Sequence, residues 1–373
     1  MSAGAPERPR SGSWRGAIEQ RLQRMWFGEP DGLTRLIALP LRLLSRIVGE
    51  VASQRRREIA RDKATRPPGG AAAVVVIGNL LVGGTGKTPL LIALARALSE
   101  RGLRVGIISR GHGARLGGRV PHRIPATGSA ADYGDEAVLV ARQTGLPVVI
   151  GHDRGAALAL LTDPASALNL DSSASMRENR LDVVLSDDGL QHAGLRRDLE
   201  LAVFDERGVG NGHCLPAGPL REPLDHALLM DAIVLNGPAA RSPIPHSRIF
   251  RFELQPVGFE SLDGHTTWSV PQFCEAARGE SIDALAGIGA PQRFFSTLAR
   301  LGLVARTWPL GDHEPIDAHW LARLPGRWLL MTSKDAVKCS AFDASLRARC
   351  VVLRVEAMVD PSLIDWLEER LRG

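Results

Sequence analysis

The stretch of the sequence that points most directly to chemistry is GGTGKT at 83–88. Its three glycines let the backbone approach a ligand closely and aim successive N–H groups at phosphate oxygens from the start of a helix. The lysine would neutralise the outer phosphates, and the final threonine hydroxyl would bind Mg²⁺. We therefore predict a nucleotide-phosphate loop, made of Leu81, Val82, Gly83, Gly84, Thr85, Gly86, Lys87 and Thr88.

The loop departs from the usual pattern at one position. A glycine is expected six residues before the lysine, and Leu81 stands there. Switch ATPases that partition or deliver cargo use a leading lysine where this chain has Val82, which counts against that class. A guanine reader of the N-K-x-D type is not evident, because Lys334 and Asp335 are adjacent in the nearest candidate, SKDA. ATP is therefore the expected nucleotide.

Two adjacent carboxylates follow an apolar run in LDVVLSDDGLQH, residues 181–192. An α/β sheet presents ligands at the carboxyl ends of its strands, and a nucleotide site needs a carboxylate there to organise Mg²⁺. A turn or a helix cap is the plainer explanation of Asp187 and Asp188. Because the pair follows a buried strand in a chain with a phosphate loop, we expect the metal-binding role.

Two further words, YGDEA at 133–137 and GDHE at 311–314, offer groups for proton transfer. Asp135 stands before a predicted helix, where capping and the helix dipole alone would favour an acidic residue. Phosphate transfer to a hydroxyl nevertheless needs a nearby base, and an aspartate paired with a histidine is a common solution. His313 could supply that histidine, although a lone histidine is ordinarily a surface residue.

The elements that must hold these residues alternate along the chain. Short buried strands are expected at 71–77, 105–109, 147–151, 183–187, 199–205 and 232–235, with a proline-opened helix at 89–101. After a strand-rich connector, a second alternation places strands at 284–287, 328–332 and 350–355 and a helix at 291–301. This order predicts an α/β fold, with a P-loop NTPase-like parallel sheet core and a smaller C-terminal α/β lobe.

The first 66 residues differ from the rest in charge. They hold 14 Lys and Arg against 7 Asp and Glu, so they carry +7 and the remaining residues carry −2 of the overall +5. Apolar residues at 36, 39, 43, 44, 47, 48 and 51 follow helical spacing, with Arg35, Arg42 and Arg46 on the other side. Three arginines and Pro40 argue against a membrane-spanning helix, whereas an amphipathic helix in the headgroups of an anionic leaflet fits. Packing of the apolar face on the protein's own core is the alternative.

Composition excludes several classes of protein. Apolar residues at 44% and charged residues at 23% are typical of a soluble globular chain, and 373 residues suffice for two domains. Aromatic residues make up only 5% and no recognition motif accompanies the basic charge, so nucleic acid is not an expected partner. Four dispersed cysteines and no secretory signal predict a reducing compartment, no structural zinc and a folded part that faces the cytoplasm.

Several words together resemble one family. In chain order they are GNLLVGGTGKTP, SRGHG, GDEA, SDDGLQH, GNGHCLPAGPLREPL, AGIGAPQRFF, DHE and TSKDAVK. In this combination the sequence resembles the tetraacyldisaccharide 4'-kinases of lipid A biosynthesis from about residue 14 to about residue 370. Members of that family also lack the first glycine of the loop.

The resemblance implies ATP-dependent phosphorylation of the 4'-hydroxyl of tetraacyldisaccharide 1-phosphate, with Mg²⁺, at the cytoplasmic face of the bacterial inner membrane. It also implies two lobes that close on each other, and an N-terminal helical element that docks on the membrane. The expected division is a disordered start with basic amphipathic membrane-associating helices (1–66), a P-loop kinase core (67–246), a strand-rich linker (247–280) and a C-terminal α/β lobe (281–373). The acylated lipid and the membrane surface are the expected partners, with no obligate protein partner.

The resemblance also implies roles for single residues. Residues 81–88 would bind ATP, Thr88, Asp187 and Asp188 would bind the metal, and Asp135, His313 and Lys87 would be catalytic. Further residues in matching words are expected to shape the site: Arg110, Glu136, Gln191, His192 and Arg221.

Two departures from the family pattern leave questions open. His112 stands where the family often has tyrosine, and Glu314 follows His313 where a second histidine is common, so the partner of Asp135 is not fixed by sequence. Two competing functions remain at this point. One is a P-loop ATPase that acts as a switch or a metal-delivery chaperone, and the other is a soluble small-molecule kinase.

Overall fold

The computed structural model describes residues 21–28, 32–65, 72–118, 120–163 and 180–372. Its strands are β1 (Ala73–Gly78), β2 (Val105–Ser109), β3 (His122–Arg123), β4 (Val148–Ile150), β5 (Val183–Asp187), β6 (Leu199–Asp205), β7 (Ala232–Asn236), β8 (Ile249–Ser261), β9 (Thr267–Trp268), β10 (Ile282–Ala286), β11 (Arg306–Pro309), β12 (Trp328–Thr332) and β13 (Cys350–Val359). Its α-helices are α2 (Gly32–Thr65), α3 (Lys87–Glu100), α4 (Ala130–Tyr133), α5 (Asp135–Thr144), α6 (Arg154–Thr162), α7 (Val270–Ala276), α8 (Pro291–Arg300), α9 (Ala318–Ala322), α10 (Ser333–Ala336), α11 (Ala344–Arg349) and α12 (Pro361–Arg372), with 3-10 helices η1 (Leu224–Leu229) and η2 (Val337–Cys339).

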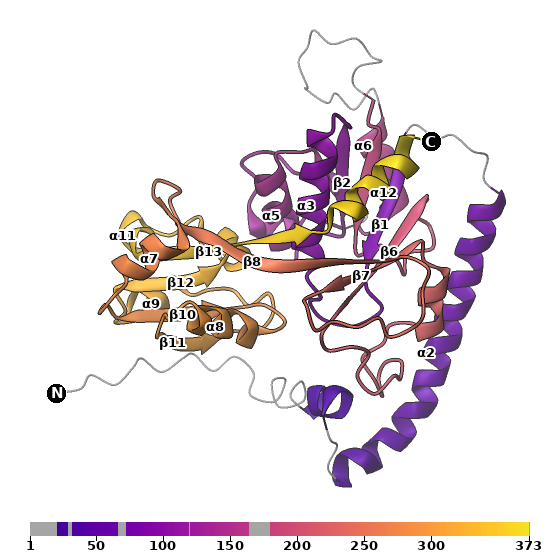
Figure 1. The fold of residues 1–373 in the computed structure, drawn as a ribbon, viewed down its shortest axis with the longest axis horizontal. Coiled ribbons are helices and arrows are strands. Elements are labelled where there is room, and N and C mark those ends of the chain that lie inside the picture. Colours follow the sequence, from indigo (N-terminus) through magenta and orange to yellow (C-terminus); the bar gives the residue numbers. More distant parts are fainter. Residues whose placement is uncertain (1–20, 29–31, 66–71, 119, 164–179, 373) are drawn as a thin grey trace.

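The strands of the described residues form one sheet of 13 strands. Their order is β11-β10-β12-β13-β8-β7-β6-β1-β5-β2-β4-β3, and β9 pairs with β8 (Figure 1). Antiparallel pairing occurs between β13 and β8, between β3 and β4, and between β8 and β9; the other pairs are parallel. This mostly parallel α/β architecture confirms the predicted fold class.

Both faces of the core sheet are buried, and β1 shows how. Val75 and Ile77 belong to a cluster with side chains of α3, α5 and α12, whereas Val74 and Val76 belong to a second cluster with side chains of α6. All four are fully buried. Alternate side chains of a strand point to opposite faces, so a run of β-branched residues fits a sheet covered by helices on both sides.

A two-stranded ribbon joins the core to the small lobe. The start of β8 pairs in parallel with β7 from Ile249 to Phe252, and the rest pairs antiparallel with β13 from Phe252 to Ser261. After β13 the chain returns to the core, where Leu363 and Leu367 of α12 are buried in the same cluster as α3 (Figure 1). Residues 281–373 therefore contribute to both lobes, and the four-part division of the chain stays a prediction.

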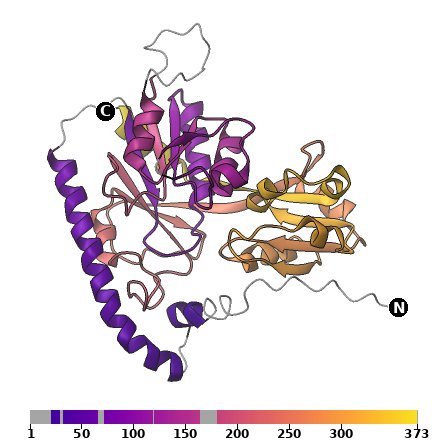
Figure 2. The same cartoon turned by 180° about the vertical axis from the view of Figure 1, so that it is seen from behind.

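A long helix dominates the described N-terminal part of the chain. One helix, α2, runs for 34 residues through the arginines at 55–57 and lies along the side of the core away from the small lobe (Figures 1 and 2). It is held there by a hydrogen bond from Ser45 to the carbonyl of Cys214 (2.7 Å) and by the ion pair of Lys63 with Asp231 (3.2 Å). The disordered start predicted for the chain lies outside the described residues.

The length and composition of α2 do not make it a bilayer span. Among the described residues, none of the helices combines the length and the apolarity needed to cross a membrane. Its first half nevertheless exposes an apolar row, Leu39, Leu43, Leu44, Ile47 and Val51, with 44–63% of each residue accessible. These five side chains do not pack on the core, so the alternative in which this face is buried is wrong for them.

Candidate active site

The loop between β1 and α3 has the backbone shape of a phosphate cradle. Gly83 and Gly86 are left-handed, with φ of 86° and 88°, a conformation that favours glycine. A Cβ on Gly86 would lie 2.4 Å from Nδ2 of Asn236, whereas nothing lies within 4 Å of a Cβ on Gly84. In the described part of the chain, the N–H groups of residues 83–86 donate to no other residue. They are therefore available to phosphate oxygens at the helix start.

The unusual leucine of the loop has a structural explanation. Leu81 is fully buried and forms an isolated antiparallel bridge with Leu220, next to the backbone hydrogen bond from Val82 to Pro219. It does not have a positive φ, unlike Gly83 and Gly86. A glycine is therefore not required at 81, because the chain is held there by pairing rather than by a left-handed turn.

Lys87, the first residue of α3, lies between two oxygen-bearing side chains. Its Nζ donates to Oδ1 of Asn79 (3.0 Å) and lies 3.6 Å from Oδ1 of Asp188. Asn79 also donates to the carbonyl of Gly83 (3.2 Å), so it supports both the loop and the lysine. Asn79 was not among the predicted site residues, although it lies in the matching word GNLLVGGTGKTP.

Asp187 and Asp188 stand at the carboxyl end of β5, beside the strand that leads into the loop. Burial and the charges of Glu136 and Asp188 raise the pKa of Asp187 to about 7. Asp188 is partly exposed; desolvation would raise its pKa, but the charges of Lys87 and Arg221 lower it to about 2. The two neighbouring carboxylates therefore have opposite shifts, which is typical of a functional site.

The oxygen ligands at the carboxyl end of β5 fit a metal ion whose other ligands are the phosphate oxygens of a nucleotide. Oδ1 of Asp187 and Oδ1 of Asp188 are buried and accept no hydrogen bond from the described residues. Thr88 lies one residue into α3, half-buried, next to Lys87. Within the described ranges, no group of three or more His, Cys, Asp or Glu side chains could hold a metal by itself. Mg²⁺ commonly binds through one or two carboxylates plus substrate phosphates, so these residues fit that ion.

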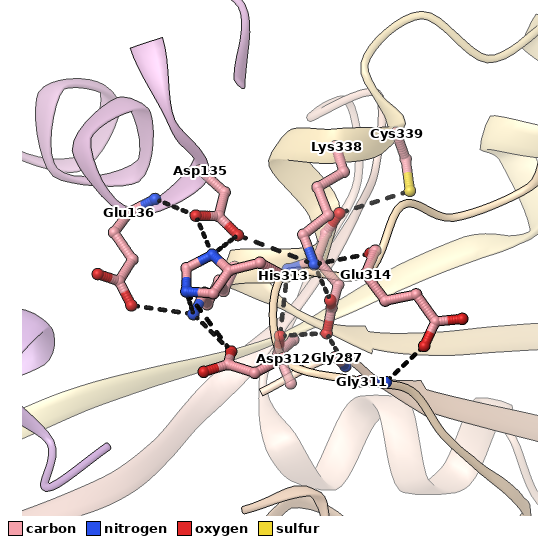
Figure 3. Close-up of polar contacts among 12 residues, drawn as sticks. Asp135, Glu136, Gly287, Gly311, Asp312, His313, Glu314, Lys338 and Cys339 are labelled. Atoms are coloured by element: carbon pink, nitrogen blue, oxygen red, sulfur yellow. Dashed lines mark hydrogen bonds and ion pairs between the residues drawn. The ribbon is translucent and has the colours of Figure 1, made fainter. Parts of the chain in front are cut away.

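Asp135 and His313 come from different lobes and meet. Asp135 is the first residue of α5, and its Oδ1 accepts a hydrogen bond from the backbone N–H of Glu136 (2.8 Å). Nδ1 of His313, in the loop after β11, lies 2.9 Å and 3.0 Å from the two carboxylate oxygens of Asp135 (Figure 3). Gly134, directly before Asp135, has a left-handed φ of 85°. A Cβ at this position would lie only 2.6 Å from the carbonyl oxygen of His112, so a larger residue would push the two segments apart.

The pair shifts the pKa of both partners. Burial opposes ionisation of Asp135, but its hydrogen bond with His313 and the charges of Lys334 and Lys338 lower its pKa. The hydrogen bond with Asp135 raises the pKa of His313, against burial and the charge of Lys334. Asp135 is therefore ionised at neutral pH and able to accept a proton.

Two lysines that were not predicted as site residues surround this pair. Nζ of Lys334 lies 2.9 Å from Oε1 of Glu136, 2.9 Å from Oδ1 of Asp312 and 3.2 Å from Nε2 of His313. Because an ammonium only donates, the neutral histidine satisfies both contacts with its proton on Nδ1 and its lone pair toward Lys334. Lys338 lies 3.8 Å from Oδ2 of Asp135 and donates to Asp335 (2.9 Å). Both lysines lie in the matching word TSKDAVK.

The structure answers the question that the two sequence departures left open. Oε2 of Glu314 accepts a hydrogen bond from the backbone of Gly311 (2.6 Å), and Figure 3 shows the side chain directed away from Asp135. His313 is thus the partner of Asp135. The ring of His112 packs on that of His313, with centroids 4.6 Å apart.

The other residues in matching words lie at different distances from the loop. Arg221 donates to Oδ2 of Asp188 (2.7 Å), and Gln191 donates to Oε1 of Glu222 (2.6 Å). His192 is bonded through Nε2 to the carbonyl of His152 (3.1 Å). Glu136 meets Lys334 as described, and Arg110 lies exposed directly after β2. The structure thus places Arg221 and Gln191 at the edge of the loop, and Glu136 beside the Asp135–His313 pair.

A second contact between the lobes involves a residue that also touches the loop. Asp205, buried at the end of β6, accepts from Arg207 of the core (3.0 Å) and from Arg293 of α8 in the small lobe (2.8 Å). Arg207 also donates to the carbonyl of Gly84 (2.9 Å). Sequence reasoning missed this group, and the only signal for it was the position of Arg293 in the matching word AGIGAPQRFF.

Fold and site together define a P-loop phosphotransferase whose site is completed by a second lobe of the same chain. A model of the family described as tetraacyldisaccharide-1-P 4'-kinase matches residues 37–372. The chain belongs to this family, which confirms the resemblance seen in its motifs and identifies the protein as a kinase.

Known relatives agree with this assignment. The tetraacyldisaccharide 4'-kinase of Azotobacter vinelandii is 41% identical over 360 residues, which cover 95% of this chain and 98% of the relative. That of Pseudomonas aeruginosa strain LESB58 is 41% identical over 359 residues, covering 95% and 98%. The crystal structure of an "apo" form of LpxK from Aquifex aeolicus in complex with ATP superposes with a TM-score of 0.68, covers 90% of this chain and 99% of that chain, and is 22% identical. It shares the fold.

The Asp135–His313 contact gives a first testable expectation. Replacing Asp135 by asparagine should lower the pKa of His313 to its ordinary value of about 6.5 or below, because burial and Lys334 remain. The pair's contribution to stability is complete below that ordinary value and is lost as pH rises through the raised pKa of His313. NMR titration of the imidazole, assigned with His313→Gln, measures the shift. An unaltered pKa of His313 would contradict the pairing.

Proposed function

We propose that this protein transfers the γ-phosphate of ATP to the 4'-hydroxyl of tetraacyldisaccharide 1-phosphate, a step of lipid A biosynthesis. Membership of the 4'-kinase family supports this substrate. The structural observation that carries the proposal is the meeting of Asp135 with His313 beside the phosphate loop. Glu136 links the Asp135–His313 pair to the phosphate loop, because its charge raises the pKa of Asp187 at the edge of the loop.

The reaction assigned to these residues is a single phosphoryl transfer. The acceptor oxygen forms a bond to the γ-phosphorus while the bond from that phosphorus to the β–γ bridging oxygen breaks, and ADP leaves. Asp135 takes the proton of the acceptor hydroxyl, since it is ionised and held by His313. Lys87 and the N–H groups of residues 83–86 hold the phosphates, so that positioning and charge supply most of the rate enhancement.

Mg²⁺ is proposed as the accompanying ion, held by Asp187, Asp188 and the hydroxyl of Thr88. When bound there with the nucleotide, it would neutralise charge on the β and γ phosphate oxygens. Arg221 and Lys87 keep Asp188 ionised. The buried oxygens of the two aspartates that lack hydrogen bonds support this assignment.

The acceptor carries four acyl chains, and exposing them to water would cost about 0.8 kcal/mol per CH₂. The enzyme should therefore work at a membrane surface. We propose the cytoplasmic face of the inner membrane, with the apolar row of α2 (Leu39, Leu43, Leu44, Ile47 and Val51) lying in the lipid boundary. The exposure of this row, with the exposed Arg42 and Arg46 beside it, supports this orientation.

The competing functions lose support. A switch ATPase or metal-delivery chaperone is not favoured, because the relatives that cover 95% of the chain are 4'-kinases by name. A soluble small-molecule kinase would not need an exposed apolar row on the helix that packs along its core.

The proposed reaction is tested with purified protein, labelled ATP, Mg²⁺ and the acylated disaccharide 1-phosphate in detergent micelles. A bisphosphorylated lipid should form, and Asp135→Ala should lower turnover by about 100-fold or more because the base is lost. Binding of ATP should persist in this variant. Asp365→Ala, an exposed aspartate of α12, serves as control, and loss of nucleotide affinity in Asp135→Ala would show that Asp135 is not the base.

The metal assignment is tested by the Mg²⁺ dependence of the same assay. Asp187→Asn should raise the Mg²⁺ concentration needed for half-maximal activity by about 10-fold or more, because one anionic ligand is lost. Asp182→Asn is the matched control, since Asp182 stands at the opposite end of the same strand and pairs with Arg104 (2.5 Å). Equal Mg²⁺ requirements in the two variants would remove Asp187 from the metal site.

The membrane orientation is tested by flotation with vesicles of phosphatidylethanolamine and phosphatidylglycerol. The double substitution Leu43→Glu with Ile47→Glu should lower the bound fraction by about 10-fold or more, because two charges would enter the lipid boundary. Val304→Glu is the control, since Val304 is 90% exposed on the small lobe. Unchanged binding of the double variant would place another surface against the membrane.

A further inference from the structure

The inner side of α2 carries a buried arginine that the apolar row does not explain. Arg56 is only 4% exposed, although its neighbours Arg55 and Arg57 are exposed. Its Nη1 donates to Oε1 of Glu200 (2.7 Å), and its Nη2 donates to Oε2 of Glu222 (3.1 Å). One guanidinium from the N-terminal helix therefore bridges two buried glutamates of the core.

One branch of hydrogen bonds leads from this arginine to the lysine of the phosphate loop. Oε1 of Glu222 accepts from Nε2 of Gln191 (2.6 Å), and the same nitrogen donates to the carbonyl of Asn79 (3.2 Å). Oδ1 of Asn79 accepts from Nζ of Lys87 (3.0 Å). Glu222, Gln191 and Asn79 thus connect Arg56 to the group that would hold the outer phosphates, with Asn79 contacted through its main-chain carbonyl and its side chain.

A second branch leads to the metal-binding edge. Oε1 of Gln191 accepts from Nη1 of Arg221 (3.4 Å), which also donates to Oδ2 of Asp188 (2.7 Å). Glu222 fixes the orientation of the Gln191 amide, because the amide nitrogen must face the carboxylate and the amide oxygen then faces Arg221. Both branches therefore depend on where Glu222 lies.

The position of Glu222 depends in turn on the groups that contact its carboxylate. Its side chain is 3% exposed, and it is held by Arg56 and by Nδ1 of His226 (2.9 Å), which contacts Ser53 of α2 through Nε2 (3.2 Å). A buried carboxylate that loses a charged partner is strongly destabilised and rearranges or becomes protonated. Either change would alter the acceptor offered to Gln191.

We propose that Arg56 is a positioning residue for phosphoryl transfer: through Glu222 and Gln191 it sets the orientation of Lys87 and Asp188. This inference rests on the proposed function and deepens it. The helix that presents the apolar row on its outer side supports the phosphate loop from its inner side. Removing α2 would then impair chemistry as well as membrane contact.

The test compares Arg56→Met, Arg56→Lys and Arg57→Met in the full-length enzyme. Arg57 is the matched control, because it is one residue away on the same helix and pairs only with the exposed Glu50 (2.7 Å) among the described residues. Measurements are kcat and KM in detergent micelles, expressed per ATP-binding site and taken well below each variant's unfolding temperature, together with vesicle binding.

Arg56→Met is expected to lower kcat by about 10-fold or more, as loss of a supporting partner of a site residue commonly does. Arg56→Lys should restore part of kcat, since a lysine can reach one glutamate but not bridge both. Vesicle binding and the kcat of Arg57→Met should equal those of the wild type. Combining Arg56→Met with Gln191→Leu should slow the enzyme no more than the slower single variant, because both interrupt one chain of contacts.

Wild-type kcat per ATP-binding site in Arg56→Met would overturn the inference, and so would losses that multiply in the double variant. If Arg56→Met does not fold, Arg56→Lys decides, because wild-type kcat in that variant would equally exclude the positioning role. These outcomes differ from failure of the proposed function, in which the wild type itself forms no bisphosphorylated lipid.

Discussion

The contact between Asp135 and His313 is the constraint on which the site depends. Asp135 begins a helix of the core, whereas His313 lies in the small lobe, 178 positions later in the chain. The two approach because both lobes belong to one sheet, whose β8 and β13 run together from core to small lobe. The ion pair of Arg293 with Asp205 joins the same two lobes. Two polar contacts thus join the lobes.

The charges next to the phosphate loop determine the ionisation of its two aspartates. Lys87 and Arg221 hold Asp188 ionised, while the buried Asp187 keeps a raised pKa and an oxygen without a hydrogen bond among the described residues. Such a site gains from a divalent cation that arrives with phosphate groups. On the far side of the core, α2 exposes an apolar row and buries Arg56 against the core. The proposed membrane contact and the proposed support of the phosphate loop would therefore use opposite sides of one helix.

Local patterns sufficed where a short stretch determines the structure. The strands at 105–109, 183–187, 199–205 and 328–332 have the predicted bounds, since apolar runs ended by turn residues mark buried strands. The sequence could not predict contacts between distant segments. Nothing local to Lys334, Arg293 or Arg56 marks its partner, because each meets its carboxylate only through the packing of segments distant in the sequence. The N-terminal helix α2 continues to Thr65, past the apolar positions that marked it in the sequence. The catalytic and metal-binding roles of the site residues stay predictions.

A double-mutant cycle on Asp135 and His313 tests most directly that the two lobes form one catalytic unit. Turnover of lipid acceptor would be measured for Asp135→Ala, His313→Ala and the combined variant under saturating ATP. If His313 acts by holding Asp135, the combined variant will be about as slow as the slower single variant, because residues that act as a unit are not additive. Losses that multiply would show two independent roles and contradict the account.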